Sequence, residues 1–183
     1  MNAIITGATK GIGRALVMHL AANKYNLALC ARNADDVEKL IAELNQIHPA
    51  LNFYGMATDL EKRSDVEAFA NFALDSFRTV DLLINNAGLF VPSGLMDEAP
   101  DALERQMQVN VHTPHYLCKF FAREMINQKK GHIVNICSTA SLNLLTGSAS
   151  YSISKAALLS LTRLLREELM PSGIRVTAVL PGA

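Results

Sequence analysis

The sequence has 183 residues, and its 17 Lys and Arg residues balance 17 Asp and Glu residues, for a formal net charge of zero. Half of the residues are hydrophobic and 19% are charged, which is typical of a globular chain and excludes a disordered one. Without a basic excess, neither nucleic acid nor an anionic membrane surface is an expected partner. No apolar run approaches the roughly 20 residues that span a bilayer.

The cysteines and histidines indicate no metal site. Cys30, Cys118 and Cys137 lie far apart in apolar segments, which is typical of small buried residues and not of a disulfide framework. His112 and His115 share one helical face, but no carboxylate or cysteine completes a set of metal ligands. The N-terminal residues lack a signal-peptide pattern. We therefore expect a cytoplasmic protein.

Short apolar runs alternate with amphipathic stretches along the whole chain. The apolar runs predict six strands, at 2–5, 26–31, 51–57, 80–84, 132–137 and 174–180. Apolar residues at helical spacing predict helices between them, at 11–22, after Asn33 and before Pro49, at 64–77, at about 101–127 and at 149–169. Buried strands separated by helices favour a parallel sheet with helices on both faces. We expect one domain over 1–183, an α/β doubly wound Rossmann-type fold that binds ligands at the carboxyl ends of its strands.

Three local signals predict where helices begin or bend. Asn33 is placed to cap the helix after the second strand. The run Ser64-Asp65-Val66-Glu67 has the form of a capping box. Pro114 should kink the long fourth helix or start a new segment, because proline lacks the N–H that a helix interior needs.

Directly after the first strand comes the loop Thr6-Gly7-Ala8-Thr9-Lys10-Gly11-Ile12-Gly13. Its glycines permit a tight turn and let backbone N–H groups approach a pyrophosphate at the start of the next helix. The spacing is G-x-x-x-G-x-G, which differs from the commoner dinucleotide pattern G-x-G-x-x-G. A glycine-rich turn without a ligand is the alternative, but the strand before and the helix after favour phosphate binding.

Tyr151 and Lys155 stand four residues apart. In a helix this spacing puts both side chains on one face, one turn apart. An ammonium beside a phenol favours the ionised phenol, so the pair is suited to reversible protonation of a carbonyl oxygen. By itself, the pair also fits a surface helix whose lysine extends into solvent.

Further motifs follow the glycine loop in order: Asn85-Asn86-Ala87-Gly88, Asn110, Ser138, the Tyr151/Lys155 pair and Pro181-Gly182. With this order and context, the chain resembles the short-chain dehydrogenase/reductase family over essentially its whole length. It looks most like the branch that includes the 3-oxoacyl-carrier-protein reductases. The resemblance implies hydride transfer between a nicotinamide cofactor and a carbonyl or alcohol.

The resemblance implies four catalytic residues. Tyr151 would be the general acid in carbonyl reduction, and Lys155 would hold the nicotinamide ribose and favour the ionised tyrosine. Ser138 would hydrogen-bond the substrate oxygen, and Asn110 would hold a water that relays protons past the lysine. From the residues alone, Ser138 fits a strand-end turn, and Asn110 fits an exposed helix asparagine.

The resemblance also implies a set of residues that bind the cofactor. Asp59 would accept a hydrogen bond from the adenine amino group, with Leu60 beside it; the alternative is an aspartate at a helix entry. The remaining members of the set are Gly7, Thr9, Lys10, Gly11, Ile12, Gly13, Arg32, Asn86, Ala87, Gly88, Tyr151, Lys155, Pro181 and Gly182.

Charge after the second strand predicts which cofactor is used. An enzyme that uses NAD usually places an acidic residue there, which binds the ribose 2′-OH and repels a 2′-phosphate. Here Ala31 and Arg32 follow, and Lys10 in the glycine loop is a second cation that could reach the same phosphate. Arg32 and Lys10 together favour NADPH over NADH. Asp35 and Asp36 are expected in the first turn of the next helix.

The chain stops at Pro181-Gly182-Ala183, where members of the family usually continue with a substrate-covering helix pair and a final strand. We therefore expect a fold without the C-terminal strand and the substrate lid. One hypothesis is an NADPH-dependent carbonyl reductase that is active in its full-length form. The other is a non-catalytic dinucleotide-binding or scaffold protein. The intact Ser138, Tyr151 and Lys155 favour the reductase.

Apolar residues near the expected site favour an apolar carbonyl substrate, a 3-oxoacyl compound or a similar ketone; loop packing or a subunit contact is the alternative. These residues are Leu89, Phe90, Leu95, Met96 and the loop Leu142-Asn143-Leu144-Leu145. The family pairs subunits through two long helices, which here carry more apolar residues than one sheet face needs. We predict a homodimer through these helices, or a homotetramer, with contacts from Tyr116, Leu117, Phe120, Phe121, Leu158, Leu161, Leu164 and Leu165.

Overall fold

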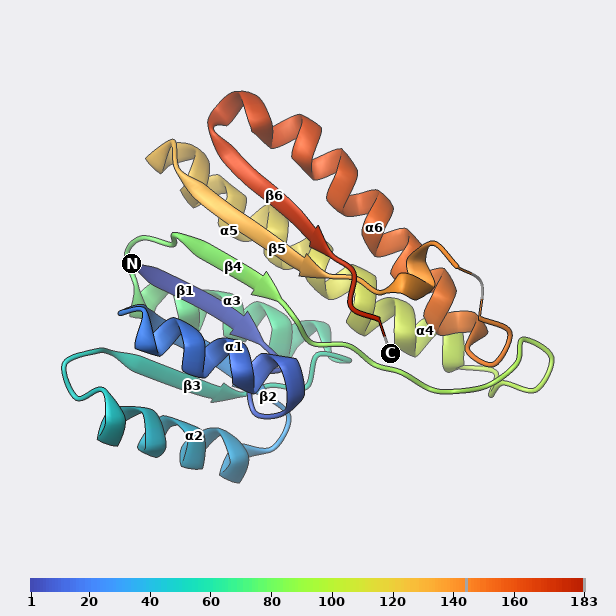
Figure 1. Cartoon of the computed structure of the whole chain (residues 1–183), viewed down its shortest axis with the longest axis horizontal. Helices are drawn as coiled ribbons and strands as arrows, with labels where there is room; N and C mark the ends of the chain where they lie inside the picture. Colours follow the sequence, from blue (N-terminus) through green and yellow to red (C-terminus); the bar gives the residue numbers. More distant parts are fainter. Residues whose placement is uncertain (144, 183) are drawn as a thin grey trace.

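The computed structural model describes residues 1–143 and 145–182, and its six strands form one parallel sheet (Figure 1). Leu144 and Ala183, named above, lie outside the described residues. The strands lie in the order β3-β2-β1-β4-β5-β6, which confirms the predicted doubly wound, Rossmann-type α/β fold. Their bounds are β1 Asn2–Thr6, β2 Asn26–Ala31, β3 Phe53–Ala57, β4 Leu82–Asn85, β5 Gly131–Ile136 and β6 Ile174–Val179.

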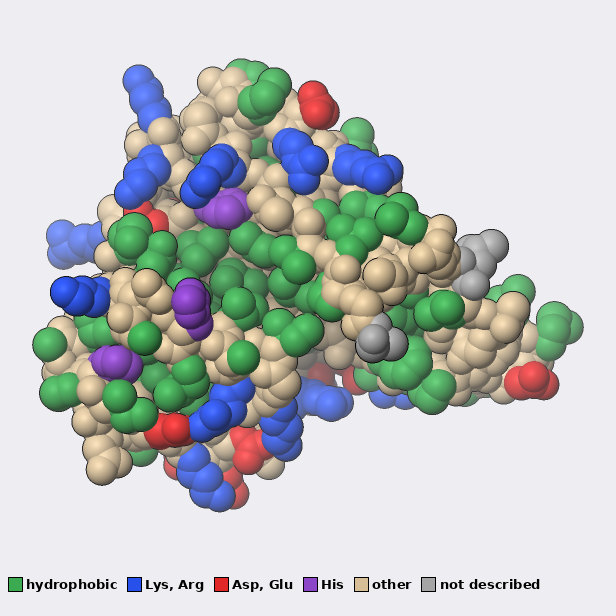
Figure 2. All heavy atoms as spheres, viewed as in Figure 1, with side chains coloured by type: hydrophobic (Ala, Val, Ile, Leu, Met, Phe, Trp, Pro, Cys, Tyr) green, Lys and Arg blue, Asp and Glu red, His purple; other side chains and the backbone are tan. Residues whose placement is uncertain are grey.

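Helices cover both faces of this sheet. One face carries α1 (Gly11–Ala22) and α2 (Ala34–Ile47), and the other carries α3 (Arg63–Ser76), α5 (Thr113–Gln128) and α6 (Ala149–Leu169). The short helix α4 (Ala102–Met107) packs against α6. Figure 1 shows β5 and β6 uncovered on the side of α1 and α2, and Figure 2 shows hydrophobic side chains gathered over β4 and β5 on that side.

The strands β1, β2 and β4 alternate their side chains between two apolar cores, which explains why they read as continuous apolar runs. Ile4 and Leu83 point into the core under α3, α5 and α6, whereas Ile5 and Ile84 point into the core under α1 and α2. Strands that are buried on both faces need apolar residues at every position. All three cysteines are free and buried, as predicted. Among the described helices, none is both long and apolar enough to cross a membrane.

Two of the three local helix signals are confirmed. Asn33 Oδ1 accepts a hydrogen bond from the Asp36 backbone N–H at 2.8 Å and caps α2. Pro114 lies in the first turn of α5, directly after a π-helical turn at Gln108–His112. The capping box is wrong, because α3 begins at Arg63 without a side-chain cap. The Asp65 carboxylate instead accepts from the Asp59 backbone N–H at 3.2 Å, since it can reach the loop after β3.

Four of the eight residues predicted to pair subunits cannot make such a contact, and Tyr116, Phe120 and Leu161 are half-buried. Leu117, Phe121, Leu158 and Leu165 are buried in the core of their own chain. α5 packs against β4 and β5, and α6 packs against β5 and β6, so these side chains complete the sheet's own cover. Leu164 differs from the other predicted contacts in being 66% exposed.

Candidate active site

The glycine loop is fastened to the neighbouring strand by Asn86, which follows β4. The Asn86 side-chain amide donates to the carbonyl oxygens of Thr6 at 3.0 Å and Gly7 at 2.9 Å. In return, Thr6 Oγ1 accepts from the backbone N–H groups of Asn86 at 3.2 Å and Ala87 at 3.1 Å. The loops after β1 and β4 therefore form one connected edge at the point where the strand order reverses, which is where doubly wound folds bind ligands.

The glycines of this loop are required by close approach and by backbone conformation. Gly7 has φ +67°, and a Cβ there would lie 2.8 Å from Ala87 Cα. A Cβ on Gly13 would overlap the Gly7 carbonyl oxygen, whereas Gly11, with φ +52°, faces open space. No side chain caps the start of α1, so its first N–H groups are left for a ligand. An open loop with free N–H groups fits the pyrophosphate of a dinucleotide.

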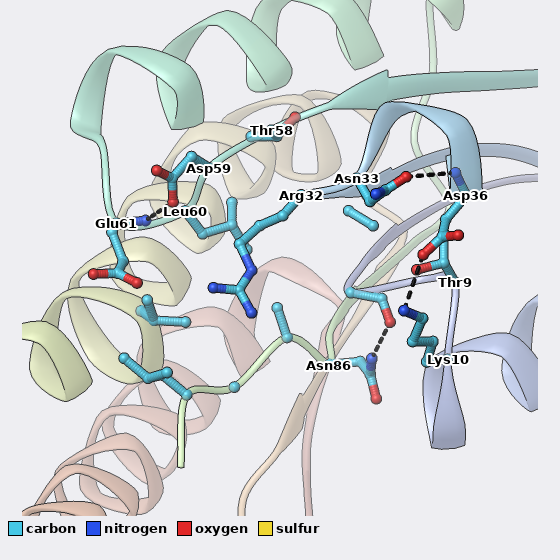
Figure 3. A pocket seen from close by; sticks show the side chains of 16 residues that line it. Thr9, Lys10, Arg32, Asn33, Asp36, Thr58, Asp59, Leu60, Glu61 and Asn86 are labelled. Carbon is cyan, nitrogen blue, oxygen red and sulfur yellow. Dashed lines mark hydrogen bonds and ion pairs between the residues drawn. The ribbon is translucent and has the colours of Figure 1, made fainter. Parts of the chain in front are cut away.

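A cavity of about 410 Å³ lies between this loop and the ends of β2 and β3 (Figure 3). Nine predicted cofactor residues line it: Gly7, Thr9, Lys10, Arg32, Asp59, Leu60, Asn86, Ala87 and Gly88. Leu89, which we expected near the substrate, also lines it, and the sequence missed six others, Ala31, Asn33, Asp36, Thr58, Glu61 and Val109. Residues that line the same cavity from five separate segments carry no common local pattern, which is why several of them were missed.

Two cations that line this cavity, Lys10 and Arg32, differ in whether an acidic side chain is paired with them. Lys10 Nζ lies 3.0 Å from the Asp36 carboxylate, so the charge that we expected to face a phosphate already has a partner. Asp36 belongs to the first turn of α2 as predicted, but it also faces the cavity. Figure 3 shows the Arg32 guanidinium extended into the cavity. In residues 1–143 and 145–182, Arg32 makes no ion pair.

A second cavity of about 440 Å³ continues the first, because Asn86 and Gly88 line both. It contains Ile12, Ser138, Tyr151, Lys155, Pro181 and Gly182 of the predicted set, together with Phe90, Ile136, Cys137, Thr139 and Leu145. The two cavities form one groove along the carboxyl ends of the strands. The groove thus has the predicted dinucleotide-binding residues at one end and three of the predicted catalytic residues at the other.

Lys155 is 3% exposed and lies on the same face of α6 as Tyr151, as the spacing predicted. Its Nζ donates to the Ile136 carbonyl oxygen at 2.8 Å and lies 5.7 Å from the centre of the Tyr151 ring. Burial lowers the pKa of Lys155 from 10.5 to about 8. The alternative of a lysine extended into solvent is therefore wrong.

Asn110 lies in the π-helical turn and is fully buried, so the alternative of an exposed helix asparagine is also wrong. Its side chain accepts from the Leu89 N–H at 2.8 Å and donates to the Leu89 carbonyl and to Ser154 Oγ, both at 2.9 Å. A π-helical turn changes the direction of the side chains that follow it. Asn110 therefore joins the loop after β4 to α6, and its contact on α6 is Ser154, the residue before Lys155.

Ser138 is half-buried at the end of β5, where its Oγ accepts from the Ala140 N–H at 3.1 Å and caps a short 3-10 turn. The turn interpretation of Ser138 is therefore correct as local structure. The same residue also lines the catalytic end of the groove. The predicted hydrogen bond from Ser138 to the substrate oxygen stays a prediction, and it is compatible with the turn because the hydroxyl proton remains to be donated.

The sequence missed a buried polar chain beneath this end of the groove. Asn85 Nδ2 donates to Asn135 Oδ1 at 2.8 Å, and Asn135 Nδ2 donates to Thr162 Oγ1 at 2.9 Å. These bonds join β4, β5 and α6 inside the apolar core, where an unpaired amide would be costly. The register of β4 and β5 places Asn85 opposite Asn135, and that pairing could be found only once the strand order was known.

Comparison with known proteins identifies the family. A family model described as short chain dehydrogenase matches residues 1–183. The chain belongs to this family. An uncharacterized oxidoreductase of Staphylococcus aureus (strain MRSA252) is 31% identical over 180 residues, which are 98% of this chain and 76% of that protein. This short-chain dehydrogenase is thus an oxidoreductase of the kind that acts on CH–OH groups with NAD(P).

Two solved structures illustrate the range of cofactors among its relatives. A metagenomic short-chain oxidoreductase in complex with NADP is 32% identical with a TM-score of 0.92, over all of this chain and 82% of that one. An NAD+-bound xylitol dehydrogenase is 30% identical with a TM-score of 0.91, over 99% of this chain and 69% of that one. The family therefore supports nicotinamide dinucleotide binding by this chain, and the residues that line its groove fit such a ligand.

The lowered pKa of Lys155 predicts a pH-dependent change in stability. Between about pH 8 and 10.5, the unfolded chain keeps a proton that the folded chain has lost, so the free energy of unfolding rises with pH. Lys155→Met removes this dependence. We compare the melting temperatures of Lys155→Met and the wild type. We expect the value for the variant minus the value for the wild type to decrease as the pH is raised from about 7 to about 10. A difference that stays constant would contradict the shift, and Lys119→Met at an exposed lysine is the control.

Proposed function

We propose that residues 1–183 are the single dinucleotide-binding and catalytic domain of an NADPH-dependent reductase that converts a ketone into an alcohol. The observation that carries this proposal is the meeting of Ser138, Tyr151 and Lys155 in a cavity that continues the glycine-loop groove. A scaffold protein would not need a desolvated lysine beside a phenol. The alternative of a non-catalytic dinucleotide-binding protein is therefore less well supported.

The reaction divides between cofactor and protein. When bound, the nicotinamide supplies the hydride. Tyr151 donates its phenolic proton to the carbonyl oxygen of the substrate, and Ser138 donates a hydrogen bond to the same oxygen. The Lys155 ammonium favours the phenolate that forms and holds the ribose hydroxyls. In the proposed proton relay, Asn110 acts from the turn that also joins the loop after β4 to α6.

The mouth of the catalytic cavity supports an apolar substrate. Ile12, Phe90 and Leu145 line it and are 49%, 55% and 49% exposed. The one charged side chain on the described lining is Lys155, which is buried. Such a mouth offers contact area to an uncharged chain or ring and no partner for a charged one. We therefore propose a 3-oxoacyl thioester or a similar apolar ketone as substrate.

We expect Tyr151→Phe to slow NADPH oxidation strongly while NADPH binding is retained, because the variant lacks only the proton donor. Loss of a general acid lowers kcat by about 10²- to 10⁴-fold. The assay follows NADPH absorbance with an acetoacetyl thioester, an aryl alkyl ketone and a small charged 2-oxo acid. The wild type should turn over the first two faster than the third. Turnover by Tyr151→Phe at the wild-type rate would contradict the assignment, as would a preference for the charged acid.

The choice of NADPH over NADH is proposed from charge. Arg32 extends into the dinucleotide cavity without an ion pair among the described residues, whereas Lys10 is paired with Asp36. Asp36 would repel a 2′-phosphate, and its pairing with Lys10 moderates that repulsion. A guanidinium can bind a phosphate through two parallel hydrogen bonds. Arg32 is thus the main candidate for recognition of the 2′-phosphate.

We expect Arg32→Ala to raise the Kd of NADPH about tenfold or more, since hydrogen bonds to charged groups contribute about 1.5–3 kcal/mol. The Kd of NADH should change little, because NADH has no 2′-phosphate. Fluorescence titration measures both constants. Arg123→Ala, at an exposed arginine of α5, is the matched control. Equal losses of affinity for both cofactors would contradict the proposed recognition.

We also propose a homodimer or a homotetramer that uses the exposed face of α6. Ile153 and Leu164 are 46% and 66% exposed, and they share one face because roughly 11 residues make three helical turns. We expect sedimentation velocity at micromolar concentration to report an oligomer, and Leu164→Glu to shift it toward the monomer. Ile47→Glu on α2 is the control. A monomeric wild type would contradict this proposal.

A further inference from the structure

The segment between β4 and α4 holds the first turn of α6 at several points. The Ser93 carbonyl accepts from the Ala149 N–H at 3.1 Å. The Glu98 carboxylate accepts from Ser150 Oγ at 2.6 Å and from the Ser150 N–H at 3.4 Å. The ring of Phe90 stands edge-on to that of Tyr151, with centres 4.8 Å apart and planes at 75°. Three consecutive residues of α6, ending in the proton donor, thus contact one loop.

Glu98 accepts a hydrogen bond from a backbone N–H in the first turn of α6, as the side chain of the N-cap residue ordinarily would. Ser148 occupies the N-cap position of α6, but its side chain makes no bond to the helix. The first N–H groups of a helix lack intrahelical partners, and a carboxylate beside them is favoured by the helix dipole. Ser150 is 1% exposed, so its hydroxyl would lose a partner if the carboxylate were removed.

We propose that Glu98 is a positioning residue that fixes the first turn of α6, through Ser150, so that Tyr151 presents its hydroxyl to the substrate. This inference rests on the proposed function of Tyr151. The first turn of a helix frays easily, and Tyr151 lies within it. Lys155 is one turn further on and has its own bond to Ile136, so that side chain is held independently of Glu98.

Glu98 bonds to Ser150 and Lys155 bonds to Ile136, so loss of Glu98 should affect kcat and the Kd of NADPH differently. Glu98 does not line the dinucleotide cavity, so its loss should leave NADPH affinity unchanged. A misplaced proton donor lowers kcat, because catalysis requires the reacting groups to be held in one geometry. A merely structural role would lower the melting temperature and leave the kcat of each folded, NADPH-binding molecule as it was.

The experiment compares Glu98→Ala, Glu98→Gln and Asp97→Ala in the proposed ketone reduction, with kcat given per NADPH-binding site. We expect Glu98→Ala to lower kcat about 10- to 100-fold at an unchanged Kd for NADPH. Glu98→Gln keeps an acceptor for the Ser150 hydroxyl and should restore most of the loss. Asp97→Ala, at the exposed neighbouring carboxylate, should match the wild type. An unchanged kcat in Glu98→Ala would overturn the inference, as would Glu98→Gln being as impaired as Glu98→Ala.

Hydrogen exchange tests the same contact without turnover. Peptides that contain Ala149, Ser150 and Tyr151 should exchange faster in Glu98→Ala than in the wild type, while peptides from α2 stay unchanged. Unaltered protection of the first turn would overturn the inference even if the wild type reduced none of the ketones. An inactive wild type with NADPH bound and with faster exchange in Glu98→Ala would count against the proposed function and leave the contact between Glu98 and α6 supported.

Discussion

The site depends on the bonds between the Asn86 amide and the carbonyls of Thr6 and Gly7. They connect the loops after β1 and β4, the two strands at which the sheet order reverses. Together with the bonds from the backbone N–H groups of Asn86 and Ala87 to Thr6 Oγ1, they fix the glycine loop against the segment that follows β4. That segment continues past Gly88 and Phe90 to α4 and contacts the first turn of α6 at Ser93, so it connects the dinucleotide cavity to the catalytic one.

Desolvation is the second constraint on the site. Lys155 is carried into the interior by α6, where one carbonyl oxygen is its hydrogen-bond partner. Burial lowers the pKa of Lys155, because it disfavours the charged form. Beneath it, Asn85, Asn135 and Thr162 hydrogen-bond to one another between two strands and the same helix. These bonds connect β4, β5 and α6.

Much of the architecture could be predicted because it follows from local patterns. The bounds of β2, α1 and α6 agree with the predicted ranges 26–31, 11–22 and 149–169. Strand and helix periods are properties of neighbouring residues, and the four-residue spacing of Tyr151 and Lys155 is another. Contacts between distant segments were not predictable in this way. Glu98 and Ser150 are 52 positions apart, and nothing near either residue marks the other as its partner.

By itself, then, the sequence determined the order of strands and helices, the glycine loop, and the pairing of Tyr151 with Lys155 on one helical face. Only the tertiary structure decided that Lys10 is paired with Asp36, that Asn110 is buried in a π-helical turn, and that half of the predicted subunit contacts on the two long helices are buried in their own core. The physical reason is that periodicity and turn chemistry act over a few residues, whereas burial and charge pairing depend on which segments the fold brings together.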